Sequence, residues 1–240
     1  MKITTLFSVL LIVLPITNVQ TMQQTKLYKK LEQYCKTLPN EFDQIPTERK
    51  KDLESLGLFF AEKRLANQDI ILNVICTHNS RRSQMAQLWF RVAASWYGVE
   101  KLTAFSGGTE GTAFHPNAVA ALKRAGFKIG ILKNGDNPLY EANYGDVIPS
   151  LMFSKKYDDS TNPKSGFSAI MVCSEADASC PVVPGAEKRF SLPFEDPKYF
   201  DGTNAEAEKY DEACRLIARD AFYALHIAKQ KVIYQLEKSK

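Results

Sequence analysis

The sequence predicts an α/β domain in which helices flank a four-stranded parallel sheet, preceded by a helical extension. From residue 69 onwards, short apolar runs alternate with amphipathic helical patterns, which indicates a parallel sheet with helices on its faces. The first of these runs is apolar almost throughout, as expected for a strand buried on both faces. The composition, with 45% hydrophobic and 24% charged residues over 240 positions, is ordinary for a globular domain and excludes a disordered chain.

The N-terminus predicts export. Lys2 precedes an apolar stretch from Leu6 to Leu14, and Pro15 follows it. This stretch is too short to span a bilayer comfortably and matches the hydrophobic region of a signal peptide. We therefore expect residues 1–21 to be a signal peptide and the mature protein to be periplasmic or secreted, with no stable membrane span. The alternatives are an uncleaved membrane anchor and a cytoplasmic protein.

Residues 22–67 predict a helical extension in two pieces. Apolar residues recur there with a helical period, and the pattern is broken between Pro39 and Pro46. We expect this extension to pack on a domain that comprises residues 68–240. The periodic apolar positions are Leu27, Leu31, Tyr34 and Leu38, followed by Leu53, Leu56, Phe60 and Leu65.

Four strands and three helices are expected within that domain. The first helix has a regular apolar stripe and ends at Gly98, and the second begins at Pro116 and ends before Gly126. Residues 131–166 are rich in Asn, Asp, Gly and Pro and predict a long loop. The expected strands are Ile70–Ile75, Leu102–Phe105, Phe167–Val172 and Lys188–Leu192, and the expected helices are 82–97, Pro116–Ala125 and 204–237.

Charge and cysteine usage narrow the class of function. The net charge of +4 is mild, and we expect no nucleic-acid partner. The five cysteines are an odd number, so at least one thiol should be free. Neither a CxxC pair nor a histidine spacing typical of zinc occurs, and no metal site is expected. Cys35 and Cys214 lie on helical patterns among apolar residues and are expected in the core.

Cys76 lies between the first predicted strand and the first predicted helix. In open parallel sheets, ligands bind at the carboxyl ends of the strands, where helix N-termini present free N–H groups. A thiol in that place favours its thiolate form, and the guanidinium of Arg82 matches a tetrahedral oxyanion. Ser83 can hydrogen-bond the thiolate, and Asn79 can brace the loop. The alternative is a buried structural cysteine. The expected oxyanion-binding residues are Thr77, His78, Asn79, Ser80, Arg81, Arg82 and Ser83.

The stretch CTHNSRRSQMAQLW, with its Cys-x5-Arg-Ser pattern, resembles the loop of the low-molecular-weight protein tyrosine phosphatase superfamily. It is most similar to the loop of the thioredoxin-coupled arsenate reductases. SGGTEGTAFHPNAVAALKRAGF also resembles the second strand and helix of the family. The resemblance covers about residues 68–225 and implies a flavodoxin-like, three-layer phosphatase fold.

Two further motifs extend the resemblance. PFEDPKYF contains Asp196-Pro197, similar to the Asp-Pro pair in which the family keeps its general acid; taken alone, such a pair is more often an ordinary turn. MVCSEADASCP contains Cys173 and Cys180, which resemble the redox pair of the arsenate reductases. Two unrelated core thiols or a structural disulfide are the alternatives for that pair.

Several positions depart from the family pattern. His78 stands where the family usually has glycine, and Arg81 stands where the arsenate reductases usually have a second cysteine. Gln87 replaces a glutamate that the relatives use around a potassium ion, so the sequence leaves potassium dependence open. The predicted loop 131–166 is longer than expected and is a candidate lid.

The resemblance implies one of two reactions. In a phosphatase, Cys76 attacks phosphorus, Arg82 holds the oxyanion and Asp196 acts as general acid and base. In an arsenate reductase, Cys76 attacks arsenate, and Cys173 and Cys180 relay the oxidation to a thioredoxin-like dithiol. Because the phosphatase reaction does not use the last two thiols, arsenate reduction is predicted. A phosphomonoesterase is the alternative, followed by a non-catalytic oxyanion sensor. No tightly bound cofactor is expected.

Overall fold

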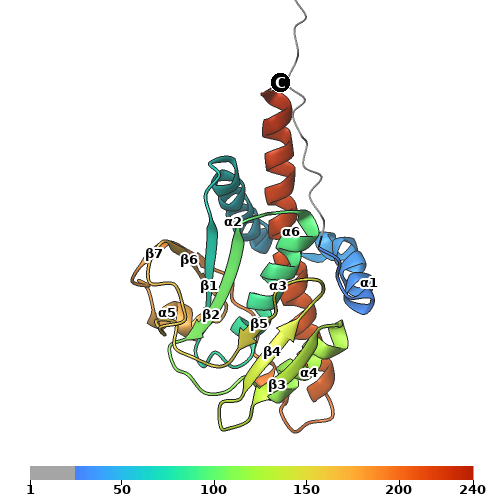
Figure 1. Cartoon of the computed structure of the whole chain (residues 1–240), viewed down its shortest axis with the longest axis vertical. Coiled ribbons are helices and arrows are strands. Elements are labelled where there is room, and N and C mark those ends of the chain that lie inside the picture. The colour runs from blue at the N-terminus through green and yellow to red at the C-terminus, as the bar shows by residue number, and fades with distance from the viewer. Residues whose placement is uncertain (1–24, 240) are drawn as a thin grey trace, which may run out of the picture.

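The computed structural model describes residues 25–239 of the chain (Figure 1). The predicted signal peptide, residues 1–21, lies outside these residues. Between residues 25 and 239, no helix has the length and apolar character needed to cross a membrane.

The main sheet has four parallel strands in the order β2-β1-β6-β7 (Figure 1). These strands are β1 (Ile70–Cys76), β2 (Leu102–Gly108), β6 (Phe167–Met171) and β7 (Ala186–Ser191). The central β6 is buried at every position, and its sequence is apolar except for Ser168. The predicted four-stranded parallel sheet is therefore confirmed. Its consequence for the site is that β1 and β6 end side by side at the same edge of the sheet.

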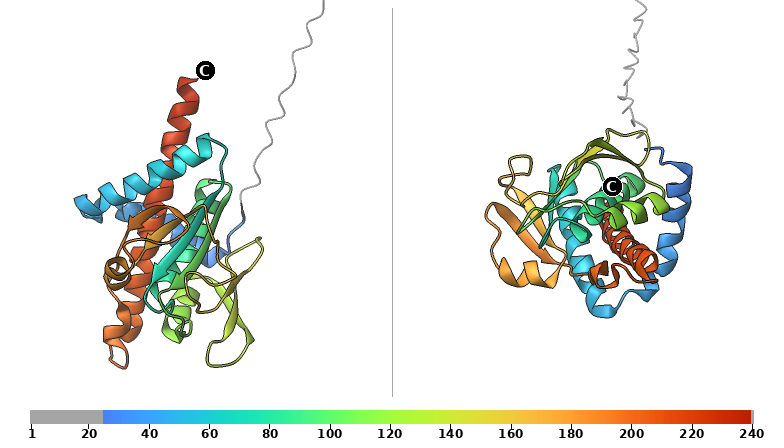
Figure 2. Two further views of the ribbon diagram at one scale, coloured as in Figure 1. Left: turned by 90° about the vertical axis from the view of Figure 1, so that its left-hand side faces the viewer. Right: turned by 90° about the horizontal axis from the view of Figure 1, so that it is seen from below.

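Helices flank this sheet (Figure 2), as the predicted phosphatase fold requires. Helix α3 (Arg82–Tyr97) packs on β1 and β2, and the long α6 (Glu206–Lys238) packs on α3 and on α4 (Pro116–Ala125). A segment without helix, residues 153–166, also packs on the sheet, where Asn73 of β1 donates to the Tyr157 carbonyl at 2.9 Å. Two short helices complete the domain, α5 (Ser174–Ser179) and the 3-10 helix η2 (Pro197–Phe200).

The N-terminal extension consists of α1 (Lys29–Thr37), a 3-10 helix η1 (Leu38–Gln44) and α2 (Thr47–Leu65), in agreement with two helical pieces. Helix α2 packs along α6, and Gly57 permits their close approach because a Cβ there would lie 2.5 Å from the Ala224 carbonyl oxygen. The extension therefore shares the hydrophobic core of the domain. Its fully buried side chains are Leu31, Cys35, Leu38, Leu53, Leu56, Phe60 and Ala61.

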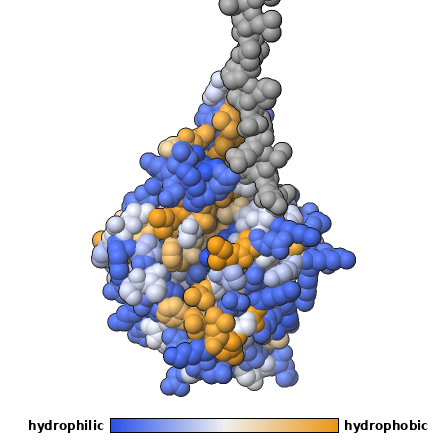
Figure 3. All heavy atoms as spheres, in the orientation of Figure 1, coloured by the Kyte–Doolittle hydropathy of each residue, from blue (hydrophilic) through white to orange (hydrophobic). Residues whose placement is uncertain are grey.

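The prediction of a long loop over residues 131–166 is wrong for its first half. A three-stranded antiparallel sheet lies there, formed by β3 (Lys128–Lys133), β4 (Leu139–Asn143) and β5 (Ser150–Met152). The many Asn, Asp, Gly and Pro residues belong to the turns between these strands and mask the short alternating pattern of β4. Apolar side chains of this three-stranded sheet reach the surface (Figure 3). They are Ile131 and Leu132 of β3 and Leu151 of β5.

Candidate active site at the carboxyl ends of the strands

The loop after Cys76 is held by its carbonyl groups. Each carbonyl from residue 76 to residue 80 accepts a hydrogen bond from a group outside the loop or from the first turn of α3. Because the carbonyls point outwards, the intervening N–H groups face the other way, as in an anion-binding nest. The pairs are Cys76 with Thr109 N (3.1 Å), Thr77 with Glu110 N (2.8 Å), His78 with Ser154 Oγ (2.9 Å), Asn79 with Gln84 Nε2 (3.0 Å) and Ser80 with His115 N (2.9 Å).

Glycine at the end of β2 lets the neighbouring segment approach this loop. A Cβ at Gly108 would lie 2.5 Å from the Thr77 carbonyl oxygen and 2.7 Å from the Asn79 nitrogen. A Cβ at Gly107 would lie 2.2 Å from the Cα of Tyr157. In the sequence, these two glycines come shortly after the second predicted strand. Their adjacency was the one signal of a close backbone approach.

Cys76, Ser83 and Asn79 meet beneath the loop. Asn79 Nδ2 donates to Ser83 Oγ at 2.8 Å, and Ser83 Oγ lies 3.1 Å from Cys76 Sγ. Because the Ser83 oxygen accepts from an amide, its own proton can point to the sulfur, where it stabilises a thiolate. Asn79 has a left-handed backbone (φ 46°), which asparagine tolerates, and its Oδ1 accepts from Lys155 N at 2.9 Å.

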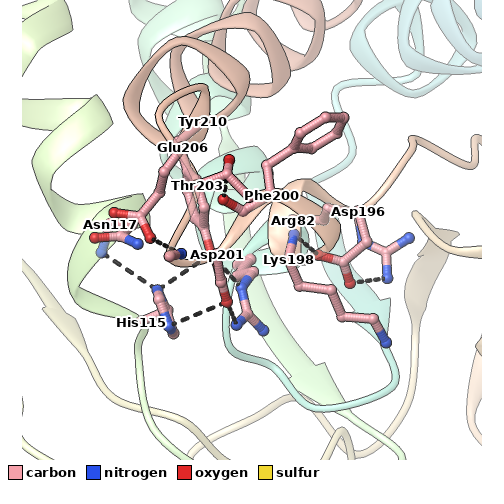
Figure 4. A network of polar contacts seen from close by, with 12 residues as sticks. Arg82, His115, Asn117, Asp196, Lys198, Phe200, Asp201, Thr203, Glu206 and Tyr210 are labelled. Atoms are coloured by element: carbon pink, nitrogen blue, oxygen red, sulfur yellow. Dashed lines mark hydrogen bonds and ion pairs between the residues drawn. The ribbon is translucent and has the colours of Figure 1, made fainter.

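Arg82 and Asp196 form a buried ion pair (Figure 4), with 2.6 Å between Arg82 Nη2 and Asp196 Oδ2. Their side chains are 6% and 7% exposed. Arg82 Nη1 also donates to the Phe194 carbonyl at 2.8 Å, and Asp196 accepts from Lys198 N at 3.1 Å. A cavity of about 870 Å³ opens beside this pair and is also lined by Glu175. The structure thus brings the candidate general acid to the candidate oxyanion-binding arginine.

The remaining loop residues point elsewhere. The His78 imidazole is exposed at the rim, 3.8 Å from the Glu110 carboxylate. The sequence groups Arg81 with the oxyanion-binding residues, but its guanidinium leaves the loop and binds Tyr210 and Asp201. Two nitrogens of the Arg81 guanidinium are therefore engaged away from the oxyanion loop.

The two candidate relay cysteines flank α5. Cys173 is fully buried, its Sγ lies 3.4 Å from Thr77 Oγ1, and it accepts from Ala176 N at the start of the helix. Burial raises the pKa of the Cys173 thiol. Cys180, at the other end of α5, is partly exposed. All five cysteines are free thiols in this structure, so a structural Cys173–Cys180 disulfide is not present.

Arg189 of β7 fastens the far end of α5. Its Nε donates to the Cys180 carbonyl at 3.2 Å, and its Nη2 donates to the Asp177 carbonyl at 2.6 Å. Ser191 Oγ adds a hydrogen bond of 2.7 Å to the Asp177 carboxylate. These contacts join residues 9 to 14 positions apart, and nothing in the local sequence pattern indicated them.

The helical extension reaches the site through Arg49 of α2. Its Nε pairs with Asp220 at 2.8 Å, and its Nη2 donates to the Leu192 carbonyl at 3.3 Å. Its guanidinium also stacks 4.5 Å from the centre of the Phe194 ring. Because the Phe194 carbonyl accepts from Arg82, the extension braces the backbone that fixes the candidate oxyanion-binding arginine.

Comparison with known proteins places the chain in a family. The model of the family "Low molecular weight phosphotyrosine protein phosphatase" matches residues 71–136. The arsenate reductase of Bacillus subtilis (strain 168) is 30% identical over 136 residues, which is 57% of this chain and 80% of that protein. The chain belongs to the low-molecular-weight protein tyrosine phosphatase superfamily, close to the arsenate reductases. It is therefore an enzyme of the phosphatase or arsenate reductase type.

The chain is also similar to a second arsenate reductase and to two solved structures. The arsenate reductase of Brevibacillus brevis is 31% identical over 125 residues, covering 51% of this chain and 73% of that protein. Among solved structures, the Vibrio cholerae low-molecular-weight phosphotyrosine phosphatase has a TM-score of 0.43 at 15% identity, covering 71% of this chain and 98% of that one. The Archaeoglobus fulgidus arsenate reductase has a TM-score of 0.44 at 19% identity, covering 65% and 98%. The fold assignment rests on the strand order and register of this chain.

The residues at the position of the family's potassium site do not fit a cation well. Gln87 is neutral, and its buried Oε1 has no hydrogen-bond partner among residues 25–239. Asn79 Oδ1 is already used by Lys155 N and lies 3.4 Å from Gln84 Nε2. Of these two amide oxygens, only Gln87 Oε1 is therefore free to act as a ligand, and one oxygen does not complete a cation site. No step of the mechanism below uses potassium.

Proposed function

We propose that this enzyme reduces arsenate to arsenite through Cys76, Cys173 and Cys180. The observation that carries the proposal is the position of Cys173, whose sulfur contacts Thr77 of the oxyanion loop at 3.4 Å. A phosphatase has no use for a second thiol at that place. The similarity to bacterial arsenate reductases supports the same reaction.

In the first step, arsenate binds to the amides of the loop and to the Arg82 guanidinium. The Cys76 thiolate, stabilised by Ser83, attacks arsenic, and one oxygen leaves as water, with Asp196, the partner of Arg82, as the candidate acid. A covalent adduct with an arsenic(V)–sulfur bond results. Preorganised donors around the oxyanion are the main source of stabilisation in such reactions.

In the second step, the Cys173 thiolate attacks Cys76 Sγ. The sulfur–arsenic bond breaks, its electron pair stays on arsenic, and arsenite departs while a Cys76–Cys173 disulfide forms. Cys180 then attacks Cys173, which releases the Cys76 thiolate and leaves a Cys173–Cys180 disulfide. A thioredoxin-like dithiol reduces that disulfide and is itself oxidised, so the electrons balance.

Helix α5 must open for the last exchange. Seven positions separate Cys173 from Cys180, and a helical rise places Cα atoms that far apart at about 10 Å. A disulfide needs Cα atoms within about 7 Å. The hydrogen bonds from Asp177 N to Cys173 O and from Cys180 N to Ala176 O, both 3.0 Å, therefore have to break during the relay.

Hydrolysis of phosphomonoesters is the second candidate function, and the Arg82–Asp196 pair favours it. Phosphoryl transfer from an aryl ester needs an acid for its leaving oxygen, and the Asp196 carboxyl stands beside the arginine that would hold the phosphoryl group. In that reaction Cys76 forms a phosphocysteine, and Asp196 then activates water to release phosphate.

Two parallel assays separate the candidates. Purified protein is given arsenate with a dithiol reducing system, and arsenite is measured; in the other assay, release of an aryl alcohol from its phosphate ester is measured. We expect arsenite formation that disappears in Cys173→Ser and persists in Cys35→Ala, which removes a buried thiol of α1 away from the loop. Aryl ester hydrolysis that Cys173→Ser leaves unchanged, without arsenite formation by the parent, would instead establish the phosphatase.

We also propose export, because the apolar stretch before Pro15 fits a signal peptide. The reductant must then share the oxidising compartment with the enzyme. Mass measurement of protein recovered from cells tests this proposal: we expect the chain to begin near residue 22, and an intact N-terminus would contradict it.

A further inference from the structure

Arg81 occupies the last position before α3, next to the arginine that pairs with Asp196. Its guanidinium donates through Nε to the Tyr210 hydroxyl at 2.7 Å and through Nη2 to Asp201 Oδ2 at 2.9 Å. The side chain is 15% exposed. Two of its three nitrogens are thus committed to groups outside the oxyanion loop.

Asp201 and Tyr210 are themselves held in place. The Tyr210 hydroxyl donates to Asp201 Oδ1 at 2.6 Å, and the tyrosine is fully buried on α6. His115 stacks on the Tyr210 ring, and its Nδ1 lies 3.3 Å from the hydroxyl. Burial alone would raise the pKa of Asp201, but the Tyr210 hydrogen bond and the Arg81 charge outweigh it and lower that pKa. Asp201 is therefore an ionised partner for Arg81 at neutral pH.

The two neighbouring arginines hold the two ends of one segment. Residues 194–201, which we call the acid segment, carry Asp196 and the 3-10 helix η2. Arg82 binds its first part through Phe194 O and Asp196, and Arg81 binds its last residue, Asp201. The contacts of Arg81 span 120 and 129 positions in sequence, so Arg81 ties the loop to both the acid segment and α6.

We propose that Arg81 is a positioning residue that fixes the acid segment, so that the Asp196 carboxyl stands at the oxyanion loop. Its effect on catalysis passes through Asp196 and not through the oxyanion. The fork of the guanidinium makes this possible, because it binds a hydroxyl and a carboxylate at once in a fixed geometry. The inference rests on the proposed function only in that Asp196 acts during turnover.

A double-mutant cycle tests this role, in whichever of the two assays depends on Asp196. Arg81→Ala should lower kcat by about tenfold or more, since a misplaced catalytic group can cost about a hundredfold. The inhibition constant of inorganic phosphate should change by less than about twofold. In an Asp196→Asn background, Arg81→Ala should have almost no further effect on kcat, because coupled residues are not additive.

Two variants sharpen the cycle. Arg81→Lys keeps the charge without the fork, and we expect it to recover little of the lost kcat. Arg124→Ala is the matched control, since Arg124 makes a similar pair with Asp211 on α6, away from the site, and should leave kcat and phosphate inhibition as in the parent. The proposal would be overturned by any of three results. The first is that Arg81→Ala lowers kcat as much in the Asp196→Asn background as in the parent. The others are that Arg81→Lys restores the parent kcat, or that Arg81→Ala greatly weakens inhibition by phosphate.

A measurement without turnover separates failure of this inference from failure of the proposed function. In Arg81→Ala, amide hydrogen exchange over residues 197–203 should be faster than in the parent, and Arg124→Ala should show no such change. Unchanged exchange in Arg81→Ala would show that Arg81 does not fix the acid segment, whichever reaction the enzyme performs. Faster exchange in Arg81→Ala, together with no arsenite formation by the parent, would support the positioning role of Arg81 and contradict the proposed arsenate reduction.

Discussion

The oxyanion loop and the α5 segment follow neighbouring strands, and both begin at a cysteine that ends or follows its strand. They are held very differently. Every carbonyl of residues 76–80 has a hydrogen-bond donor from outside the loop or from α3, and Gly108 packs against the loop backbone. Helix α5 has six residues, with Ser174, Glu175 and Ser179 exposed, and depends on Arg189 and Ser191. The loop is thus held along its whole length, whereas α5 is held at one end only, which suits the opening of α5 that the proposed relay requires.

Removing the sulfur of Cys76 from the oxyanion loop should abolish activity. We expect Cys76→Ser to reduce both arsenate reduction and aryl ester hydrolysis to traces, because a serine hydroxyl lacks a neighbouring base to make it a nucleophile. Circular dichroism and the thermal midpoint should match the parent, since the exchange is nearly isosteric. Substantial turnover by this variant would place the nucleophile elsewhere.

Removing the last thiol of the α5 segment should stall the proposed relay. Cys180→Ser is expected to release one arsenite per enzyme and then stop, trapped as a Cys76–Cys173 disulfide. Mass spectrometry of non-reduced peptides identifies that bond. Repeated turnover by Cys180→Ser would show that the external reductant attacks the first disulfide directly.

A methyl group placed against the oxyanion loop should lower both stability and phosphate binding if the loop is tightly packed. In Gly108→Ala the new Cβ would lie 2.2 Å from the Glu110 carbonyl oxygen, so the loop has to shift. We expect a loss of about 1–3 kcal/mol in the free energy of unfolding, together with weaker inhibition by phosphate. Gly130→Ala on β3 is the matched control, because nothing lies within 4 Å of its new Cβ. Equal behaviour of the two variants would contradict a tightly packed loop.

The pH dependence of arsenite release should reveal the buried relay thiol. Burial raises the pKa of Cys173 above its usual value, so its thiolate fraction increases with pH through the neutral and mildly alkaline range. In single turnover of Cys180→Ser at saturating arsenate, the release rate should increase by up to about tenfold per pH unit below that pKa. The raised pKa also affects stability, because the folded protein holds the Cys173 proton more tightly than the unfolded chain does. This contribution to the free energy of unfolding is present at neutral pH and is lost as the pH rises through the raised pKa. A release rate independent of pH would show that thiol deprotonation does not limit it.

The smallest effect should come from loosening α5. Arg189→Met removes the hydrogen bonds to Cys180 O and Asp177 while keeping an unbranched side chain. We expect the Cys173–Cys180 disulfide to form a few-fold faster, since about 1 kcal/mol of restraint is removed per hydrogen bond. Amide exchange of residues 174–180 should accelerate in parallel. A slower disulfide would show that Arg189 holds Cys180 in the reactive position.

Local patterns were sufficient to predict the frame of the site. Strand β1 and helix α3 were predicted within one residue of their ends, since an apolar run and a regular stripe depend on nearby residues only. The strands of the small antiparallel sheet were missed because they have three to six residues each and lie among turn residues.

The residues that hold the oxyanion loop from distant parts of the chain could not be predicted from local sequence patterns. Ser154 and Lys155 brace a loop 76 positions earlier, and Arg81 binds partners that follow it by more than a hundred. No periodicity encodes such pairs, because they arise only when the strands and helices are assembled. The motif did predict that Arg82 and Asp196 belong together, but not that Arg81 turns away from the oxyanion.

The position of α6 also sets the order of events while the chain is made. The ribosome produces α2 early and α6 last, yet Leu53, Leu56 and Phe60 of α2 are fully buried in a core that α6 completes. Until the final residues emerge, the growing polypeptide cannot close this core and must expose apolar surface, as chains with many non-local contacts do. For the export that we propose, such late closure would keep the chain unfolded enough for translocation.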